Sequence, residues 1–147
     1  MSRFIKWFAI LLLAISIPAW AGDAVIGFVK TVAGEASVIN AGKIIKAQVG
    51  TPIKTGDVLK TGAKGSLGVT FKDNTVMSFG PDTELTVDEY LYAPGKGDLK
   101  LQASMAKGTL QVVSGVIAKL KPDSVALKTP AGIIGVRGTH FAVKVEP

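Results

Sequence analysis

The chain contains no cysteine among its 147 residues. Disulfide bonds and thiolate metal ligands are therefore excluded, and apolar burial with backbone hydrogen bonding must stabilise the fold. There is one histidine, His140, so a metal site built on paired histidines is excluded too. The alternation of the strand pattern around His140 places it on the outward face, and we expect a surface histidine. The sequence predicts no metal site.

No hydrophobic run is long enough to cross a bilayer. The longest, residues 7–17, has about eleven residues, short of the roughly 20 that a transmembrane helix needs. Arg3 and Lys6 precede this run, and Ala19-Trp20-Ala21 follows it with small residues at both ends. This is the pattern of a signal peptide. We expect cleavage near Ala21, no transmembrane segment afterwards, and a periplasmic or secreted product.

The excess of positive charge is small. Removal of residues 1–21 leaves 147 − 21 = 126 residues, with 17 − 2 = 15 basic and 11 acidic side chains, or a net charge of +4. All but one of these basic residues are lysines, which occur singly among apolar residues. The few aromatic residues do not interleave with them as a base-stacking surface requires. We expect no nucleic-acid partner.

Short apolar segments rich in β-branched residues alternate with turn signals along residues 22–147. The turn signals recur about every eight to twelve residues, which is typical of all-β domains. The 17 glycines supply the turns that such short strands need. We predict a single all-β domain over residues 22–147, with many short strands in a sandwich or β-roll.

The clearest hairpin lies in residues 67–79. Its apolar residues alternate on both sides of Asp73-Asn74, and asparagine tolerates the positive φ of a tight turn. Residues 94–97, which include Pro94 and Gly97, are expected to form an exposed tip.

Residues 99–120 allow two interpretations at their end. Leu99 to Ala103 alternate as one strand, and Gly108 to Val113 read as another. Residues 112–120 also fit a helical stripe, although Ser114-Gly115 weakens it. We therefore leave open one short helix near residues 112–120.

The most unusual segment is residues 129–145, TPAGIIGVRGTHFAVKV. Its end alternates as a half-buried strand with Phe141 on the inner face. The same register extended backwards would carry Arg137 into the apolar layer. Either a bulge at Gly138 turns Arg137 out to water, or Arg137 stays inside and pairs with a carboxylate.

We favour the inward alternative for Arg137. Its partner would come from the acidic residues Asp57, Asp73 and Glu84, and glycines on both sides of Arg137 indicate a crowded position. A guanidinium binds a carboxylate through two parallel hydrogen bonds. Such a pair would hold the last turn of the fold.

Catalytic patterns are absent from the sequence. Gly132, Gly135 and Gly138 are spaced by three, which is neither a dinucleotide nor a phosphate-binding fingerprint. Asp88-Glu89 is the only adjacent pair of carboxylates, and neighbours on a strand point to opposite faces. We assign no catalytic or cofactor-binding residue and expect a protein that is not an enzyme.

The segment has the form T-P-x-x-x-I-G-V-R-G-T-x-F-x-V, which resembles the signature of the FecR domain family. Upstream blocks resemble the family in the same order: Gly56-Asp57, Phe71 to Thr75, Lys107 to Leu110, and Ser114-Gly115. The motif residues that we single out for a structural or partner-binding role are Thr129, Pro130, Gly135, Arg137, Gly138, Thr139 and Phe141.

The resemblance implies an exported all-β interaction module of the bacterial envelope. In the best-known members it is the periplasmic part of a regulator that passes a signal from an outer-membrane iron-siderophore transporter to a sigma factor. This sequence shows no anti-sigma segment before the apolar residues 7–17, so we expect a stand-alone module. We expect it to bind another envelope protein in signalling or assembly, by strand addition at an open sheet edge. The sequence carries no signal for an oligomeric state.

The alternative function is a binding module for cell-wall glycan or polysaccharide. Tyr90 and Tyr92 alternate correctly to share one face of a strand. If that face is exposed, the two rings could contact sugar.

Overall fold

The structure is a computed structural model that describes residues 24–135 and 138–146. The predicted signal peptide, the cleavage site at Ala21 and Arg137 lie outside the described residues. Within those two ranges, no helix has the length and the apolar character needed to cross a membrane.

Most of the described chain is β-strand, as predicted. Its elements, in order, are β1 (Val25–Ala33), β2 (Ala36–Asn40), β3 (Lys43–Lys46), β4 (Pro52–Lys54), β5 (Val58–Thr61), β6 (Ser66–Phe71), β7 (Val76–Phe79), β8 (Glu84–Ala93), η1 (Pro94–Lys96), β9 (Asp98–Val113), α1 (Val116–Leu120), η2 (Pro122–Ser124), β10 (Val125–Thr129), β11 (Gly132–Gly135) and β12 (His140–Val145).

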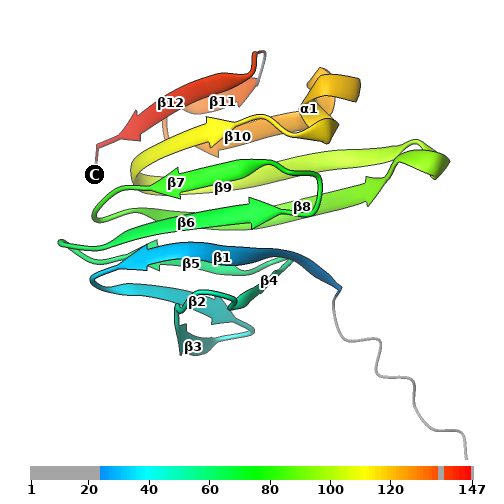
Figure 1. Cartoon of the computed structure of the whole chain (residues 1–147). Helices are drawn as coiled ribbons and strands as arrows, with labels where there is room; N and C mark the ends of the chain where they lie inside the picture. Colours follow the sequence, from blue (N-terminus) through cyan, green and yellow to red (C-terminus); the bar gives the residue numbers. More distant parts are fainter. Residues whose placement is uncertain (1–23, 136–137, 147) are drawn as a thin grey trace, which may run out of the picture.

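The strands form two facing layers that share one long strand, β9 (Figure 1). One layer has the order β3-β2-β5-β8-β9-β10-β11, and the other has the order β4-β1-β6-β7-β9-β12. The first part of β9 pairs with β8 and β10, and its last part pairs with β7 and β12. All pairings are antiparallel except the one between β9 and β10. The predicted all-β fold, a sandwich or β-roll of many strands, is confirmed.

Gly108 allows β9 to pass from one layer to the other. Its φ is +105°, a conformation that L-residues rarely adopt, and a Cβ at this position would collide with Thr83. The expectation of separate short strands at Leu99 to Ala103 and Gly108 to Val113 is therefore wrong. The glycine continues a 16-residue strand through a bend instead of starting a new one.

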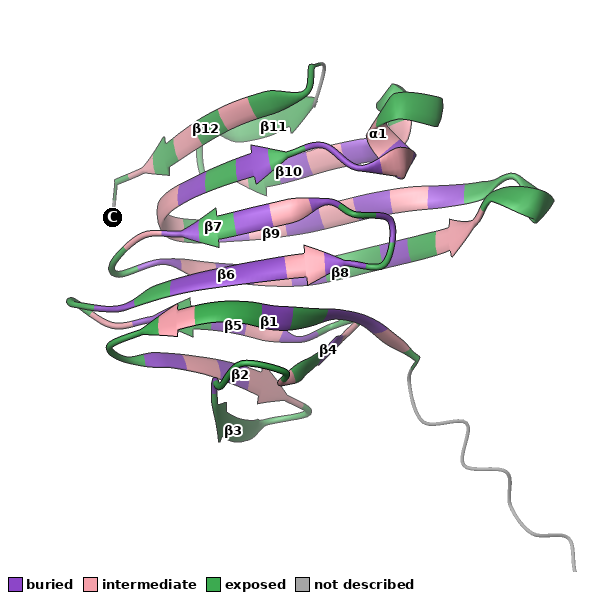
Figure 2. Cartoon of the chain, viewed as in Figure 1, coloured by how far each residue is buried: buried purple, intermediate pink, exposed green. Residues whose placement is uncertain are grey.

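The hydrophobic core fills the space between the layers. Figure 2 shows buried residues along the middle of most strands, alternating with exposed ones. The largest side chains that are almost completely buried are Phe71, Ile53, Leu59, Leu85, Leu101, Met105, Leu110 and Ile117. Burial of a side chain of this size contributes roughly 1.5–3 kcal/mol.

The predicted hairpin is present as β6 and β7, with Asn74 at φ +68° in its turn. The loop after β8 is an exposed tip, also as expected. The short helix left open for residues 112–120 occurs as α1, which begins after Gly115, because Val112 and Val113 still belong to β9.

Candidate functional site

The FecR-like segment is divided between the two layers. β11 pairs with β10 in one layer, whereas β12 pairs with β9 in the other. A single strand register through residues 129–145 is therefore the wrong description, because the chain changes layer between Gly135 and His140. Thr129 and Pro130 end β10 and begin the turn to β11, where the Thr129 hydroxyl donates to the carbonyl oxygen of Gly132 at 2.9 Å.

The predicted alternation holds in β12 itself. Phe141 is half-buried against the core, and His140 is exposed. Gly138 has a φ of +127°, and its carbonyl oxygen accepts a hydrogen bond from the Ser114 hydroxyl at 2.7 Å. The Ser114 N–H donates to the carbonyl oxygen of Thr139 at 2.8 Å. Ser114 thus holds the start of β12 beside the end of β9.

Asp73 is the centre of a buried polar cluster. Its carboxylate accepts hydrogen bonds from the Thr75 hydroxyl at 2.7 Å, the Tyr90 hydroxyl at 2.8 Å and the Ile117 N–H at 3.1 Å. The Asp73 N–H in turn donates to the Tyr90 oxygen at 3.0 Å. Asp73 is completely buried, so this one side chain connects the β6–β7 turn to β8 and to the start of α1.

The position of Tyr90 contradicts the glycan-facing role. Its side chain is 7% exposed, and its ring stacks on Phe71 with a centroid distance of 5.4 Å. Tyr92 is half-buried and packs against the core. The two tyrosines do share a face, but it is the inner face of β8, where aromatic rings add to the core.

Burial also raises the pKa of the Tyr90 phenol far above its ordinary value, and the neighbouring Asp73 carboxylate acts in the same direction. The ionised phenolate is unfavourable in this apolar, negatively charged surrounding. Tyr90 therefore stays a neutral donor to Asp73 at every ordinary pH.

A second buried acid, Asp57, holds the turn between β4 and β5. Its carboxylate accepts from the Asn40 side-chain amide at 2.6 Å and from the Lys54 N–H at 2.8 Å. Its carbonyl oxygen accepts from the Val87 N–H at 3.0 Å. Asp57 is 2% exposed, so these contacts join three strands beneath the surface.

Two threonines form a third cluster near Gly108. The Thr83 hydroxyl contacts the carbonyl oxygens of Gly80, Pro81 and Thr109 at 2.9–3.2 Å. It also accepts from the Thr109 N–H at 3.1 Å. Thr61 accepts from the Thr83 N–H at 2.9 Å and donates to Gly80. These hydroxyls are used by the fold itself.

The predicted carboxylate partner of Arg137 stays a prediction, because Arg137 lies outside the described residues. Two of the three candidates, Asp57 and Asp73, already accept the hydrogen bonds described above. Glu84 is half-buried and lies opposite Lys60 and Lys107 in the strand register.

Two neighbouring acidic side chains of β8 contact residues of β9. Glu89 forms an ion pair with Lys100 at 2.7 Å, and its neighbour Asp88 accepts a hydrogen bond from Ser104.

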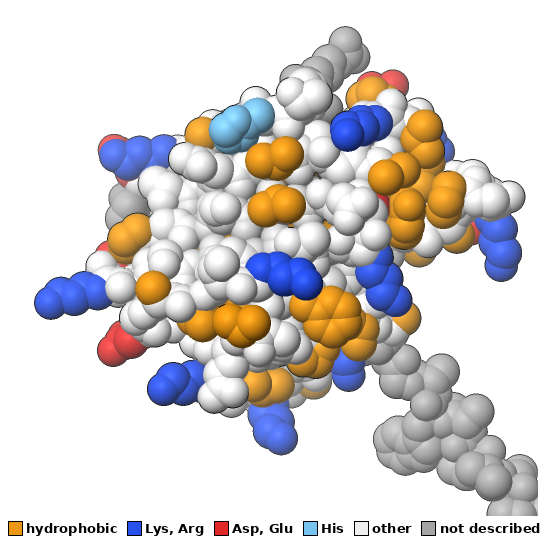
Figure 3. Space-filling view, viewed as in Figure 1, with side chains coloured by type: hydrophobic (Ala, Val, Ile, Leu, Met, Phe, Trp, Pro, Cys, Tyr) orange, Lys and Arg blue, Asp and Glu red, His pale blue; other side chains and the backbone are white. Residues whose placement is uncertain are grey.

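Within residues 24–135 and 138–146, no group of three or more histidine or acidic residues could hold a metal ion. Figure 3 shows the lysines scattered singly over the face in view.

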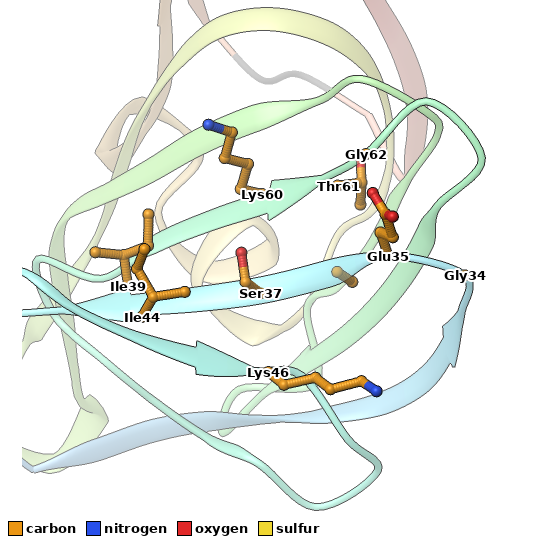
Figure 4. A pocket seen from close by; sticks show the side chains of 10 residues that line it. Gly34, Glu35, Ser37, Ile39, Ile44, Lys46, Lys60, Thr61 and Gly62 are labelled. Carbon is orange, nitrogen blue, oxygen red and sulfur yellow. The ribbon is translucent and has the colours of Figure 1, made fainter.

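An open groove of about 620 Å³ lies over β2, β3 and β5. Its lining includes Ser37, Ile44, Lys46 and Lys60 (Figure 4). The two lysines extend away from each other, so their charges do not focus on one point.

The edges of the two layers differ in chemistry. Among the described residues, each layer ends in two strands that pair on one side only: β3 and β11 in one layer, and β4 and β12 in the other. Three of these edges contain lysine or proline, namely β3 with Lys43 and Lys46, β4 with Pro52 and Lys54, and β12 with Lys144. β11 has the sequence Gly-Ile-Ile-Gly, and all four residues are exposed.

Lysine and proline at an edge prevent pairing with another chain, because a charge must stay hydrated and proline lacks an N–H. β11 has neither protection. Sequence reasoning missed this feature, since residues 132–135 were assigned to a strand that continued into β12. The missed signal is the two-residue turn Pro130-Ala131, which makes β10 and β11 a hairpin.

Comparison with known proteins identifies a family. A family model described as FecR protein matches residues 57–147, which is 91 of the 147 residues. No curated protein and no solved structure matches the chain. The matched region runs from Asp57 through the Asp73 cluster and Gly108 to β11 and β12.

Proposed function

Because the chain belongs to the FecR protein family, we propose that it is an exported envelope protein that binds another envelope protein in a signalling or assembly pathway. The family is associated with the envelope and with signalling. Residues 1–21 would direct export, as the signal-peptide pattern indicates. The proposal includes no catalytic role.

The observation that carries the proposal is the unprotected edge of β11. The Gly132–Gly135 strand is exposed, uncharged and paired on one side only. Ile133 is 70% exposed beside unpaired backbone, so a partner strand could cover it. An extended segment of a partner can add to such an edge, with backbone hydrogen bonds for affinity and alternate side chains for specificity.

The buried polar clusters of the described chain serve the fold. Thr61, Thr75 and Thr83 use their hydroxyls in hydrogen bonds that hold the fold. Asp57 and Asp73 do the same with their carboxylates. The FecR-like blocks therefore position the strands, and these buried groups are not available to a partner.

The test is capture of the partner in intact cells. The full 147-residue chain with a C-terminal tag is expressed in its own host, cross-linked in the cells and purified, and bound proteins are identified by mass spectrometry. We expect one stoichiometric envelope protein with the wild type and with the Ile44→Lys variant, and its loss with Ile133→Lys. Ile44 is the matched control, because it is 71% exposed on the edge strand β3.

The mass of the purified chain reports the processing step, with cleavage after Ala21 expected. Absence of any stoichiometric envelope protein, under cross-linking that traps a known envelope complex in the same cells, would contradict the binding role. Recovery of the same protein with Ile133→Lys would keep the binding role and move it away from β11.

A further inference from the structure

The backbone of β11 has hydrogen-bonding groups that point away from the sheet. Thr129 and Gly132 flank a two-residue turn, so they form the first bonded pair of the β10–β11 hairpin. Alternate residues of an antiparallel strand then face the opposite side. Ile133 and Gly135 therefore direct their N–H and C=O groups to the free edge.

We infer that a second copy of this chain pairs with β11, in antiparallel orientation across a two-fold axis. The inference rests on the proposed function in one respect, that β11 is the binding edge. It adds the identity of an occupant. Each copy contributes the layer that ends in β11, and these two layers then join into one continuous sheet across the dimer.

The two-fold axis restricts the register. An axis perpendicular to a sheet keeps each side chain on its own face, so one residue must lie opposite its own copy. When that residue is Ile133, its outward backbone groups bond to those of Ile133 in the second copy. Gly132 then lies opposite Ile134, and Ala131 opposite Gly135.

This register covers both isoleucines. Ile133 meets its own copy on the outer face, where it is now 70% exposed. Ile134 is 37% exposed and lies beside the buried Leu127 on the inner face. Its neighbour in the second copy would be Gly132, where no atom lies within 4 Å of the position that a Cβ would take. The glycine leaves room for the isoleucine.

Charge permits self-pairing at β11 and opposes it at β3. Residues 131–135 carry no charge, so two copies can approach without like-charge contact. The equivalent strand β3 has lysines at both ends, Lys43 and Lys46. With Ile44 or Ile45 on the axis, one lysine becomes the diagonal neighbour of its own copy, at about 7–8 Å. That repulsion is the usual protection of an edge.

The predicted dimer is closed and weak. A two-fold contact covers both β11 edges at once, so it does not propagate into a fibre. A seam of about five residues buries much less than the roughly 800 Å² per partner of a standard interface, so we expect an affinity in roughly the micromolar to millimolar range. Because both use the same edge, a partner strand would displace the second copy.

The first test measures the oligomeric state. The full chain is expressed, purified as the cell processes it, and examined by sedimentation equilibrium over a wide concentration series. We expect a monomer–dimer equilibrium for the wild type and for Ile44→Lys. Ile133→Lys places like charges opposite each other on the axis, and we expect it to weaken the dimer by at least about tenfold.

The second test measures disulfide formation by single introduced cysteines, which have no native cysteine to compete with them. In the proposed register the two Cα atoms of residue 133 are about 5.5 Å apart, within the range of a disulfide. Under mild oxidation I133C should form a disulfide dimer many times faster than I44C, whose exposure in the wild type is nearly the same.

The outcomes separate this inference from the proposed function. A wild type that stays monomeric at all concentrations, or equal oxidation rates for the two cysteine variants, would overturn the β11 dimer. Neither result affects capture of a different envelope protein. A dimer that survives Ile133→Lys unchanged would also overturn it.

Discussion

Two parts of the region that matches the FecR family model have opposite surroundings. The Asp73 cluster is buried and each of its polar groups has a partner within the fold. The β11 edge is exposed, apolar and paired on one side only. Both belong to the region that the family model matches.

The difference separates stability from interaction. A buried carboxylate with several donors stabilises one arrangement of strands, because each donor that loses it is left unsatisfied. An exposed edge contributes little to folding, and its groups are available to a second chain. Substitutions in the first region should change the free energy of unfolding, and substitutions in the second should change association only.

The largest effect on stability is expected for Asp73→Ala. The change removes the acceptor for Thr75, Tyr90 and the Ile117 N–H in a completely buried site. Each unsatisfied buried donor costs about 1–3 kcal/mol, and partial rearrangement reduces the sum. We expect a loss of roughly 3–5 kcal/mol in the free energy of unfolding, measured by urea denaturation of the purified full chain.

Asp98→Ala is the matched control, because Asp98 is exposed at the tip of the β8–β9 hairpin. Its unfolding free energy should stay within about 0.5 kcal/mol of the wild type. Equal effects of the two substitutions would break the comparison, since burial would then have no bearing on the cost.

The next largest difference in stability is expected between two glycine substitutions, Gly108→Ala and Gly135→Ala. Gly108→Ala should cost roughly 2–4 kcal/mol, because the new Cβ meets Thr83 and φ is +105°. Gly135→Ala has open space around the new Cβ, and its cost should stay within about 0.5 kcal/mol. Thermal unfolding of the two variants measures the difference.

The contrast fails if Gly135→Ala is as destabilising as Gly108→Ala. In that case β11 would be part of the stabilising structure, and its exposure would not mark a binding edge. A small cost at Gly108 would instead mean that Thr83 can move aside without losing its hydrogen bonds.

Local patterns predicted the local structure. Alternating apolar residues located β6, β7 and β12, and Asn74 has the positive φ expected of the hairpin turn. The helical stripe at the end of β9 was also realised, as α1. In each case the predictive pattern lies in residues close in the sequence.

Long-range packing decided the rest. Whether Gly108 ends a strand or bends it depends on Thr83, which lies 25 residues earlier, and no local pattern contains that contact. The sequence predicted that Tyr90 and Tyr92 share one face of a strand. Whether that face is exposed depends on the layer that packs opposite β8. The division of residues 129–145 between layers depends on which strands β11 and β12 find as neighbours.

The smallest effect is expected for Tyr90→Phe, and it depends on pH. The change keeps the ring against Phe71 and removes the hydroxyl that bonds Asp73. At neutral pH we expect a loss of about 1–2 kcal/mol. Because the folded protein raises the pKa of Tyr90, this contribution is complete below the unfolded value of about 10 and is lost as the pH rises above it.

Unfolding free energies of wild type and Tyr90→Phe should therefore converge above about pH 10, by up to roughly 1.4 kcal/mol per pH unit. The difference between the two curves cancels the titration of lysines that both proteins share. Tyr92→Phe is the control. Its unfolding free energy should still decline above about pH 10, because the Tyr90 hydroxyl is still present. Curves that stay parallel through pH 11 would show that Tyr90 ionises in the folded chain as easily as in the unfolded one, and the Asp73 cluster would then be as open to solvent as the β11 edge.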